Sequence, residues 1–238
     1  IIINQPDSIY TSLIVSNYNG YNVSCYGLSD ANIDVEINGG TSPFQIYFST
    51  TVATIDSMIY IDSLASGSYT DSIIDNNGCI FTEQLNLDEP QNLTMNLLSN
   101  NQSCSSSCDG EIITQVSGGV APYIYYLDTL TVNDTLDGLC LGMYGIRAID
   151  NNGCIINDST YIGQPLALTI NLDSIFNVSI YGGNDGSIYT TSSGGNGNLY
   201  YSWQGPNNFT ASTNNISNLI SGMYVLQISD SIGCNLID

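Results

Sequence analysis

Residues 108–127, CDGEIITQVSGGVAPYIYYL, contain the pattern on which the fold prediction depends. In the second half of this stretch, Tyr123, Tyr125 and Leu127 occupy every second position. A period of two is typical of a strand with one buried face, whereas a helix repeats about every 3.6 residues. The pair Gly118-Gly119 interrupts the stretch with the residue type that best tolerates a tight turn. The stretch therefore predicts two strands joined by a turn.

The same pattern occurs three times in the chain. SDANIDVEINGG (29–40) and NDGSIYTTSSGG (184–195) align with residues 108–119 without a gap, and an apolar residue follows each second glycine by eight positions. These apolar residues are Phe48, Leu127 and Trp203. Each copy then has a Gly-x-Tyr frame and, ten residues after the tyrosine, the cysteine of an Asp-x-x-Gly-Cys motif. The tyrosines are Tyr69, Tyr144 and Tyr224, and the cysteines are Cys79, Cys154 and Cys234. A fixed order of motifs indicates tandem repeats of one domain.

Each copy closes on a dipeptide that ends in proline, at Gln5-Pro6, Glu89-Pro90 and Gln164-Pro165. These dipeptides assign residues 1–6 to the last strand of a preceding repeat. The remaining residues form three repeats: 7–90 (repeat 1), 91–165 (repeat 2) and 166–238 (repeat 3, with an incomplete last strand). Two arrangements fit this division. Either the chain is a window on a longer array, or separate subunits join head to tail, with Ile1 to Ile3 donated as a strand to a neighbour.

The alternation of strands and turns predicts an all-β fold of three tandem immunoglobulin-like β-sandwich domains with about seven strands each. The period of two also appears in repeat 1, at Phe44, Ile46 and Phe48. No stretch predicts a helix longer than a turn. The Gly-x-Tyr frame is similar to the tyrosine corner of immunoglobulin-like domains, in which the phenol ties a loop to the sandwich. The alternative is that these tyrosines only fill the core.

Composition excludes most catalytic and several binding functions. The chain has 22 acidic residues against one basic residue, Arg147, and no histidine, so its formal net charge is −21. Without histidine or lysine it cannot contain a Ser-His-Asp triad, a Schiff-base lysine or a His-based zinc site. Its charge disfavours binding to nucleic acid and to anionic membranes. No apolar run approaches the roughly 20 residues of a membrane-spanning helix, so membrane insertion is not expected.

Seven cysteines predict disulfides and an oxidising, extracellular location. Cys25 and Cys104 share one column of the repeat alignment, and Cys79 and Cys154 share another. We therefore predict the bridges Cys25–Cys79 and Cys104–Cys154. Each closes a loop of about 50 residues, which stabilises a small domain by roughly 4 kcal/mol in the chain-entropy model.

Of the other three cysteines, two lie outside these columns and one lies in the second column but has no partner in its own repeat. Cys108 and Cys140 occur only in repeat 2, which predicts a third bridge between them. Repeat 3 has Ile180 in the column of Cys25 and Cys104, so Cys234 is predicted to be a free thiol in the core, facing Ile180. A redox or metal-binding role for Cys104 and Cys108 is the alternative.

In their fixed order these motifs resemble a known family, the SprB-type repeat of cell-surface proteins and gliding-motility adhesins of Bacteroidota. The motifs are a cysteine before Asp-Gly-x-Ile, Gly-Gly-x-x-Pro-Tyr (118–123), Tyr-Ser-Trp (201–203), Leu-x-x-Gly-x-Tyr, Asp-x-x-Gly-Cys and the closing Gln/Glu-Pro. The resemblance extends over nearly the whole chain. It implies type IX secretion, tandem immunoglobulin-like domains and a structural or adhesive role in a surface fibre, without catalytic residues. Repeat 3 departs from the pattern at Ile180 and at Asn198, which stands where the motif has proline.

A second resemblance concerns modification. Nine aspartates are followed by Ser or Thr and then by Ile, Leu, Met or Thr, more often than composition predicts. The triplet resembles the O-glycosylation signal of Bacteroidota. This resemblance implies glycans on Ser8, Ser57, Ser63, Ser72, Thr129, Thr135, Ser159, Ser174 and Ser231. The alternative is that Asp-Ser and Asp-Thr pairs serve as ordinary turns and caps.

Calcium is the one cofactor that the sequence leaves open. Asp75 and Asp150 head Asp-Asn-Asn-Gly turns, and Asp30, Asp109 and Asp185 recur near domain ends. Oxygen-rich turns of this kind suit a hard cation, although Asp-Asn-Asn-Gly is also an ordinary hairpin turn.

Three functions follow from these observations. The leading hypothesis is a segment of an extracellular filament or adhesin stalk on the cell surface, whose partners are neighbouring repeats or copies of the same protein. The second is a module that binds a surface polysaccharide through exposed tyrosines or Trp203. The third is an enzyme that uses paired carboxylates, but no spacing singles out an acid and a base.

Overall fold

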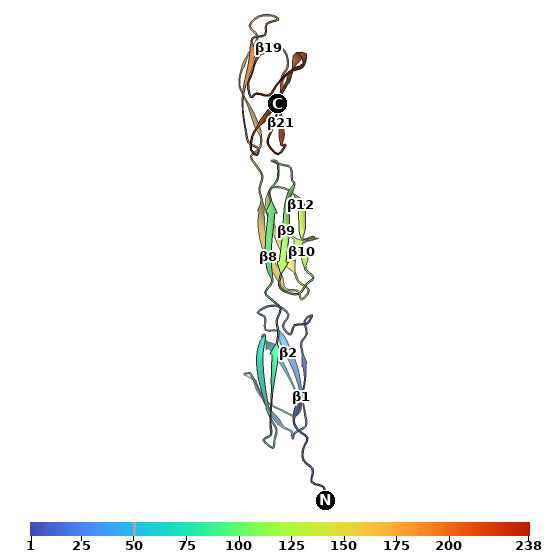
Figure 1. Cartoon of the computed structure of the whole chain (residues 1–238). Helices are drawn as coiled ribbons and strands as arrows, with labels where there is room; N and C mark the ends of the chain where they lie inside the picture. Colours follow the sequence, from blue (N-terminus) through green and yellow to red (C-terminus); the bar gives the residue numbers. More distant parts are fainter. Residues whose placement is uncertain (50) are drawn as a thin grey trace. The chain divides into compact units, whose positions relative to one another are not determined.

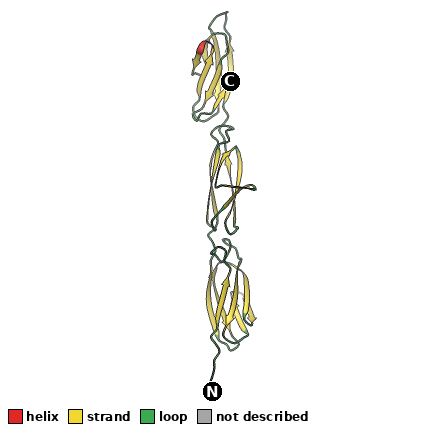
Figure 2. Ribbon diagram, turned by 90° about the vertical axis from the view of Figure 1, so that its right-hand side faces the viewer, coloured by secondary structure: helices red, strands yellow, loops and turns green. Residues whose placement is uncertain are grey.

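The computed structural model describes residues 1–49 and 51–238, and the chain is all-β (Figure 1). Strands form nearly all of its regular structure (Figure 2). Within the described residues the helical content is one 3-10 turn, η1 (Pro206–Asn208), as the sequence predicted. None of the described segments is a helix with the length and apolar character needed to cross a bilayer.

Repeat 1 consists of a three-stranded sheet, β1-β2-β5, and a four-stranded sheet, β4-β3-β6-β7. All of the paired strands described for it are antiparallel. The strands are β1 (Tyr10–Val15), β2 (Ala31–Asn38), β3 (Phe44–Phe48), β4 (Thr51–Ile55), β5 (Met58–Leu64), β6 (Gly67–Ile74) and β7 (Ile80–Leu87).

Repeats 2 and 3 have the same topology. Repeat 2 contains the sheets β12-β9-β8 and β11-β10-β13-β14, and repeat 3 contains β15-β16-β19 and β18-β17-β20-β21. The strands of repeat 2 are β8 (Thr94–Asn100), β9 (Gly110–Ser117), β10 (Ile124–Leu127), β11 (Leu130–Val132), β12 (Thr135–Leu139), β13 (Gly142–Ile149) and β14 (Ile155–Ile162). Those of repeat 3 are β15 (Thr169–Phe176), β16 (Gly186–Ser193), β17 (Tyr200–Gly205), β18 (Phe209–Ala211), β19 (Ile216–Leu219), β20 (Val225–Ser229) and β21 (Asn235–Ile237). The described residues thus confirm the prediction of tandem β-sandwich domains with about seven strands each.

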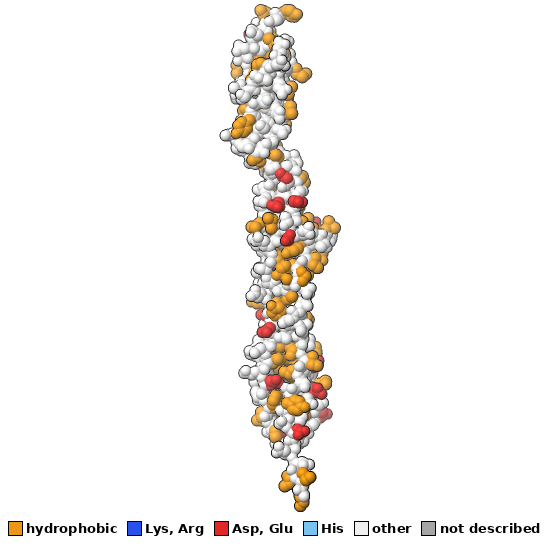
Figure 3. Space-filling view, turned by 45° about the vertical axis from the view of Figure 1, so that its right-hand side comes forward, with side chains coloured by type: hydrophobic (Ala, Val, Ile, Leu, Met, Phe, Trp, Pro, Cys, Tyr) orange, Lys and Arg blue, Asp and Glu red, His pale blue; other side chains and the backbone are white. Residues whose placement is uncertain are grey.

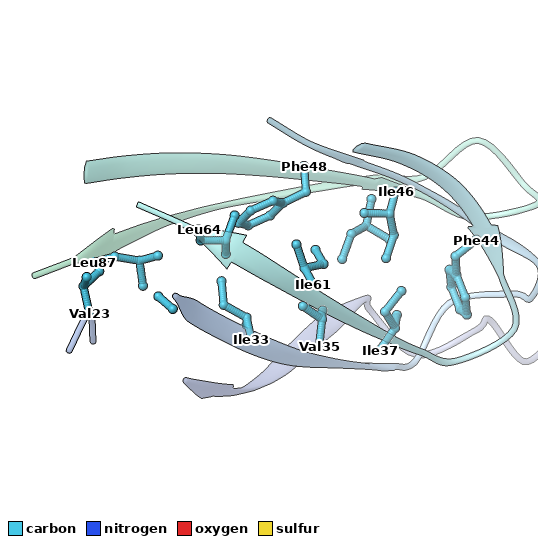
Figure 4. Packing of buried hydrophobic residues seen from close by; sticks show 12 residues of the cluster. Val23, Ile33, Val35, Ile37, Phe44, Ile46, Phe48, Ile61, Leu64 and Leu87 are labelled. Carbon is cyan, nitrogen blue, oxygen red and sulfur yellow. The ribbon is translucent and has the colours of Figure 1, made fainter. Parts of the chain in front are cut away.

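The core of repeat 1 lies between its two sheets (Figure 4). The buried side chains of β2 and β3 alternate with more exposed ones, so each strand turns one face to the other sheet. On the four-stranded sheet, Phe48 stacks on Tyr69 with 5.3 Å between ring centroids. Burying one large apolar side chain contributes about 1.5–3 kcal/mol, so the alternation alone favours this pairing of sheets.

Smaller clusters occupy the equivalent places in the other repeats. In repeat 2, Ile112, Leu139 and Ile162 are buried together. In repeat 3, Trp203 is only 3% exposed, and its indole Nε1 donates a hydrogen bond to the carbonyl of Thr213 at 2.9 Å. Trp203 is therefore a core residue and not a surface for sugars.

The three tyrosines of the Gly-x-Tyr frames share one hydrogen bond. In each repeat the phenol donates to the backbone carbonyl four residues earlier, at 3.0–3.1 Å. The pairs are Tyr69 with Ala65, Tyr144 with Cys140 and Tyr224 with Ile220. These contacts confirm the tyrosine-corner prediction, because the phenol ties a loop to the strand that follows.

The described residues form two compact units. Unit 1 contains Ile1–Asn96, Gln115–Asn133 and Ile146–Asp158, and unit 2 contains Leu97–Thr114, Asp134–Gly145 and Ser159–Asp238. Unit 1 thus contains repeat 1 and part of repeat 2, and unit 2 contains the rest of repeat 2 and repeat 3.

Asp71 is a core position at which repeat 1 has a charged residue and the other two repeats have apolar ones. It lies on β6, is 5% exposed, and occupies the place of Ile146 and Leu226, which are buried in repeats 2 and 3. One of its carboxylate oxygens accepts the backbone N–H of Glu83 at 3.1 Å. Burial, and then the charge of Glu83, raise the pKa of Asp71 above its ordinary value of 3.8. At neutral pH the ionised side chain therefore destabilises repeat 1.

Asp71→Asn is expected to stabilise the protein at neutral pH. Asparagine keeps an oxygen for the N–H of Glu83 but removes the charge. Because the folded pKa of Asp71 is raised, its protonated form contributes its full stability below pH 3.8, and that contribution is lost as the pH rises through the folded pKa. We expect the variant to gain about 1 kcal/mol at pH 7 after allowance for solvent screening. Thermal unfolding at pH 3 and at pH 7 measures the gain, which should disappear at pH 3.

The matched control is Asp62→Asn, on an exposed part of β5. It should leave the melting temperature unchanged at both pH values. An equal gain in the two variants would show that the effect reflects net charge rather than the burial of Asp71.

Candidate functional site: the disulfide-linked repeat junctions

Two of the three disulfides join consecutive repeats. Cys25 of repeat 1 is bonded to Cys154 of repeat 2, and Cys104 of repeat 2 is bonded to Cys234 of repeat 3. The bonded cysteines are 129 and 130 residues apart in sequence, with Cα–Cα distances of 5.8 and 5.6 Å. The first bridge lies within unit 1 and the second within unit 2. Along the chain, the spans of the two bridges overlap between residues 104 and 154.

The predicted bridges Cys25–Cys79 and Cys104–Cys154 are therefore wrong. In repeat 1, Cys25 precedes β2, whose first residue pairs with the last residue of β5. From that end of the sandwich, β6 runs eight residues, roughly 26 Å, before it reaches the turn with Cys79. A disulfide requires Cα atoms within about 7 Å of each other. The two cysteines of one repeat thus lie at opposite ends of its sandwich and reach only a neighbouring repeat.

The prediction that Cys234 is a free core thiol facing Ile180 is also wrong, because Cys234 is bonded to Cys104. Among the described residues the free cysteine is Cys79, which is exposed. The structure contains the bridge expected between Cys108 and Cys140 within repeat 2. Because Cys104 and Cys108 are both in disulfides, they do not form the thiol pair of the redox or metal alternative.

In the two bridges that join repeats, the later cysteine lies in what we call the cysteine turn, residues 150–154 and 230–234, with 75–79 as the equivalent in repeat 1. In repeat 2, one oxygen of Asp150 accepts the backbone N–H groups of Asn152 (2.9 Å) and Cys154 (2.8 Å). The other oxygen accepts the N–H of Val120 at 2.8 Å. A Cβ atom at Gly119 would lie 2.4 Å from this oxygen, so the position requires glycine. The Gly-Gly and Asp-x-x-Gly-Cys motifs are therefore parts of one structure.

The cysteine turns of repeats 1 and 3 have the same hydrogen bonds. Asp75 accepts the N–H groups of Asn77 and Cys79, at 2.9 and 2.8 Å. Asp230 accepts those of Ile232 and Cys234, at 3.1 and 2.9 Å. The turn is thus formed by its own aspartate, whether or not its cysteine is bonded.

The first cysteine of each bridge lies in what we call the cysteine loop, residues 22–30 and 101–109, with 177–185 as the equivalent in repeat 3. In repeat 1, Ser24 donates its backbone N–H to Asp30 at 3.0 Å and its hydroxyl to the other oxygen of the same carboxylate. The corresponding pairs are Ser103 with Asp109 and Ser179 with Asp185, each with an N–H to carboxylate distance of 2.9 Å. An aspartate therefore also positions the residue next to Cys25.

The cysteine loop also holds the dipeptide that ends each repeat. The N–H of Gly27 donates to the Glu89 carboxylate at 2.6 Å, and the N–H of Ser106 donates to the side-chain oxygen of Gln164 at 3.3 Å. Each acceptor directly precedes the proline that closes the repeat. These contacts give the Glu and Gln side chains of the closing motifs a structural role.

Asn152 adds hydrogen bonds to the bridge between repeats 1 and 2. Its side-chain amide donates to the carbonyl oxygens of Ser24 (2.8 Å) and Tyr18 (3.2 Å). Its side-chain oxygen accepts the amide of Asn19 at 2.6 Å. Asn152 stands two residues before Cys154, so the same turn supplies both the covalent and the polar contacts of this junction.

The disulfide between repeats 2 and 3 is accompanied by different polar contacts. Ile232 stands where the first junction has Asn152, and here the side-chain amide of Asn196 donates to the carbonyl of Ser103 at 3.5 Å. A groove of about 520 Å³ lies beside the bridge, lined in part by Ser105, Pro165 and Leu236. The repeats thus share a covalent link while their polar contacts vary.

Hydrogen bonds make several of these aspartates more acidic than usual. The hydroxyls of Ser103 and Ser107, with the backbone N–H of Ser103, lower the pKa of Asp109 to about 2. At Asp75, burial opposes ionisation, but backbone N–H groups, that of Cys79 first, outweigh it and lower the pKa. The side chain and backbone of Ser179 likewise lower the pKa of Asp185. These carboxylates therefore stay ionised well below neutral pH and keep their hydrogen bonds to the cysteine turns, the cysteine loops and the equivalent loop of repeat 3.

The calcium candidates coincide with these positioning residues. Asp75 and Asp150 hold cysteine turns, and Asp30, Asp109 and Asp185 hold cysteine loops or their equivalent. In the part of the chain that the structure describes, no three Asp, Glu or Cys side chains group closely enough to hold a metal ion. Calcium binding at these residues stays a prediction, and their observed contacts are hydrogen bonds to backbone and serine.

Most of the predicted glycosylation sites lie on the surface. Ser72 and Ser174 are half-buried, and the other seven side chains are exposed. The exposed ones are Ser8, Ser57, Ser63, Thr129, Thr135, Ser159 and Ser231. Their exposure satisfies the steric requirement for modification, and glycosylation itself stays a prediction.

Sequence reasoning missed the serines of the cysteine loops and Asn152. A signal for the serines was present, because Ser24, Ser103 and Ser179 stand in one column, six residues before an aspartate. The signal for Asn152 was weaker. Its column contains asparagine in repeats 1 and 2 but isoleucine, Ile232, in repeat 3.

No protein-family model matches the chain, and no curated protein matches it. Among solved structures, it is similar to Sidekick-1 immunoglobulin domains 1–5, with 11% identity over 97% of this chain and a TM-score of 0.36. The chain spans 58% of that structure. It is also similar to the FN1–FN3 domains of chicken CNTN1, with 11% identity, coverage of 98% of each chain and a TM-score of 0.26. The fold described above is established by the sheets of this chain itself.

Proposed function

We propose that the chain is a non-enzymatic structural segment of a long extracellular surface fibre or adhesin stalk built from tandem immunoglobulin-like repeats. The observation that carries this proposal is the covalent connection of consecutive repeats by Cys25–Cys154 and Cys104–Cys234. A disulfide between two repeats does not help to form a binding or catalytic site within one repeat. It does transmit tension from one repeat to the next, in parallel with the linker peptide. Disulfides also persist mainly in oxidising compartments, which supports a secreted or extracellular location.

The family resemblance gives the proposal its biological setting. In that setting the chain is a type IX-secreted surface protein of Bacteroidota, with a role in gliding motility or adhesion, and glycans at the Asp-Ser and Asp-Thr sites coat the stalk. Intact mass measurement of the native protein tests the coat. A mass above that of the polypeptide is expected, and a mass equal to that of the polypeptide excludes glycosylation.

A second candidate function is the binding of a surface polysaccharide. It is supported by an open groove of about 1080 Å³ in repeat 3, lined in part by Phe176, Tyr181 and Met223. Tyr181 and Phe176 are 107% and 59% exposed, and exposed aromatic rings can stack on sugars. The candidate is weaker than a structural role because it rests on one groove of repeat 3, whereas the two long bridges connect all three repeats.

The proposal includes an alternative assembly of separate subunits joined head to tail. Ile1, Ile2 and Ile3 are exposed, and β21 pairs with β20 over only three residues. Donation of Ile1–Ile3 from one copy to the open edge beside β21 of another would extend that sheet. A native mass far above the 25.5 kDa of this chain that persists in denaturant with reductant favours one long polypeptide instead.

Immunoelectron microscopy of intact source cells tests the leading proposal. Antibodies raised against the folded 238-residue chain are expected to label fibres that project from the cell surface. Labelling only after the cells are permeabilised would contradict it. A glycan array probed with the same chain separates the two functions, because a stalk should give no signal. Dose-dependent binding that Tyr181→Ala abolishes would support the polysaccharide-binding module.

A further inference from the structure

Cys79 occupies a cysteine turn whose two counterparts are both bonded to another repeat. Cys154 is bonded to Cys25 and Cys234 to Cys104, in each case to the cysteine loop of the preceding repeat. Cys79 is exposed and is the unbonded cysteine of the described residues. Cys79 thus has the position of the two bonded turn cysteines but no bond of its own.

The turn around Cys79 already has the geometry of a bonded turn. The N–H of Cys79 donates to Asp75 at 2.8 Å, the distance also found between Cys154 and Asp150. The N–H of Asp75 donates to the Cys79 carbonyl at 3.0 Å, and the same distance separates the equivalent atoms in the other two turns. Gly78 has the positive φ of its counterparts, at 83°. Bridge formation at this site thus needs no rearrangement of the turn.

Asn77 lies in the same turn as Cys79. It occupies the position of Asn152, whose amide donates to two carbonyl groups of the preceding repeat. In repeat 1 the Asn77 amide donates to the hydroxyl of Thr41 at 2.8 Å, on the exposed side of the turn. A carbonyl from a docked cysteine loop could take the place of this exposed hydroxyl without leaving the amide unpaired.

We propose that Cys79 forms a disulfide with the cysteine loop of a further repeat of the same kind, one that carries cysteine in the column of Cys25 and Cys104. The inference rests on the proposed role as a segment of tandem repeats. The partner is not the third repeat of a second copy, because that repeat has Ile180 in the required column. The two thiols lose two protons and two electrons to a disulfide oxidant such as oxidised glutathione, which becomes two molecules of the reduced thiol.

Repeat 3 provides a means to test this site with the chain itself. Its loop keeps the organisation of the two bonded loops, since Ser179 donates its N–H to Asp185 at 2.9 Å. Ile180 is 71% exposed beside the open groove of repeat 3. Figure 3 shows apolar side chains exposed at the end of repeat 3 that carries this loop, at the top of the view. Ile180→Cys therefore gives one copy the cysteine that the proposed partner must have.

In the presence of oxidised glutathione, Ile180→Cys is expected to form a ladder of disulfide-linked multimers on non-reducing gels. Peptide mapping should locate the new bond between residue 79 and residue 180. The double variant Ile180→Cys/Cys79→Ser should form dimers at most, as should the wild type, since each has one free thiol. The positional control is Tyr181→Cys, because Tyr181 is the more exposed neighbour at 107%. We expect Ile180→Cys to form the 79-to-180 linkage at least ten times faster than Tyr181→Cys forms its own linkage to Cys79.

Equal rates for Ile180→Cys and Tyr181→Cys would overturn the inference, because they would show collision of exposed thiols rather than a specific junction. Failure of Ile180→Cys to link, with an unchanged melting temperature and the three native bridges intact, would also overturn it. Neither result affects the proposed stalk function, which depends on the existing bridges and is tested by labelling of intact cells.

Discussion

Pulled from its two ends with all disulfides intact, the chain is expected to extend to only about a fifth of the length that it reaches after reduction. The reason is that the three bridges together give a short covalent path through the unfolded polypeptide. From Ile1 the path runs to Cys25, crosses to Cys154, and returns toward Cys140. It then crosses to Cys108, continues to Cys104, and crosses to Cys234 near the end of the chain.

This path contains few residues. The four polypeptide stretches along it contribute 24, 14, 4 and 4 residue steps, 46 in all, against 237 for the reduced chain. At about 3.3–3.6 Å per step, with the three bridges added, the oxidised chain reaches about 170–180 Å and the reduced chain about 780–850 Å. Single-molecule force spectroscopy with handles at the two ends measures the difference directly as the final contour length.

A double variant, Cys108→Ser/Cys140→Ser, provides an internal calibration. Without that bridge the path includes all 50 residue steps from Cys154 to Cys104, which brings the total to 78. The expected contour length is then about 270–290 Å. A wild-type length near that of the reduced chain would contradict the bridges between repeats, and so would a length unaffected by the loss of Cys108 and Cys140.

Removing one bridge between repeats is expected to cost much more stability than removing the free thiol at the equivalent position. Cys25→Ser/Cys154→Ser opens a bridge that joins residues 129 apart, and a native bridge of this kind contributes about 2–4 kcal/mol. For a domain of 60–100 residues, a loss of about 3 kcal/mol lowers the melting temperature by roughly 12–24 °C. Cys79→Ser changes the same position of the turn in repeat 1, where no bond is lost, and should alter stability by less than about 0.5 kcal/mol.

Calorimetry of the two variants under non-reducing conditions measures both effects. The comparison also discriminates between the two pairing schemes. If Cys25 were bonded to Cys79, as the repeat alignment alone suggested, Cys79→Ser would destabilise the protein as strongly as the double variant does. Equal melting temperatures in the two variants would therefore contradict the pairing found in the structure.

The fold could be predicted from local patterns because each pattern has one structural meaning. The alternation at Phe44, Ile46 and Phe48 places these side chains on one face of β3, and the structure buries all three. The Gly-x-Tyr frame predicted a tyrosine corner, and the phenol of Tyr69 makes the expected bond to a loop carbonyl. Such features depend on residues within one repeat, and three copies of each pattern reinforce the prediction.

The disulfide pairing could not be predicted in the same way. Bridges within a repeat and bridges to the next repeat use the same two alignment columns, and each scheme leaves one of the seven cysteines unpaired. They differ only in whether that cysteine is Cys234 or Cys79. The decision depends on the length of β6, which separates the two ends of the sandwich, and periodicity does not reveal which end a loop occupies.

The roles of the repeated aspartates were hidden for a related reason. Asp30, Asp109 and Asp150 were predicted as weak calcium ligands because oxygen-rich turns suit that ion. In the structure they accept hydrogen bonds from N–H groups and serine hydroxyls next to the cysteines. A carboxylate in a turn has the same sequence signature whether it receives hydrogen bonds or binds a cation, so the sequence alone did not reveal these hydrogen bonds, and calcium binding stays a prediction.

The overlap of the two long bridges has a consequence for survival outside the cell. Any single peptide bond between residues 25 and 234 is spanned by Cys25–Cys154, by Cys104–Cys234 or by both. A protease that nicks the backbone once in this region therefore leaves the two fragments attached to each other. A surface structure built in this way tolerates isolated cuts in its exposed loops, and it separates only after a second cut at a suitable place or after chemical reduction.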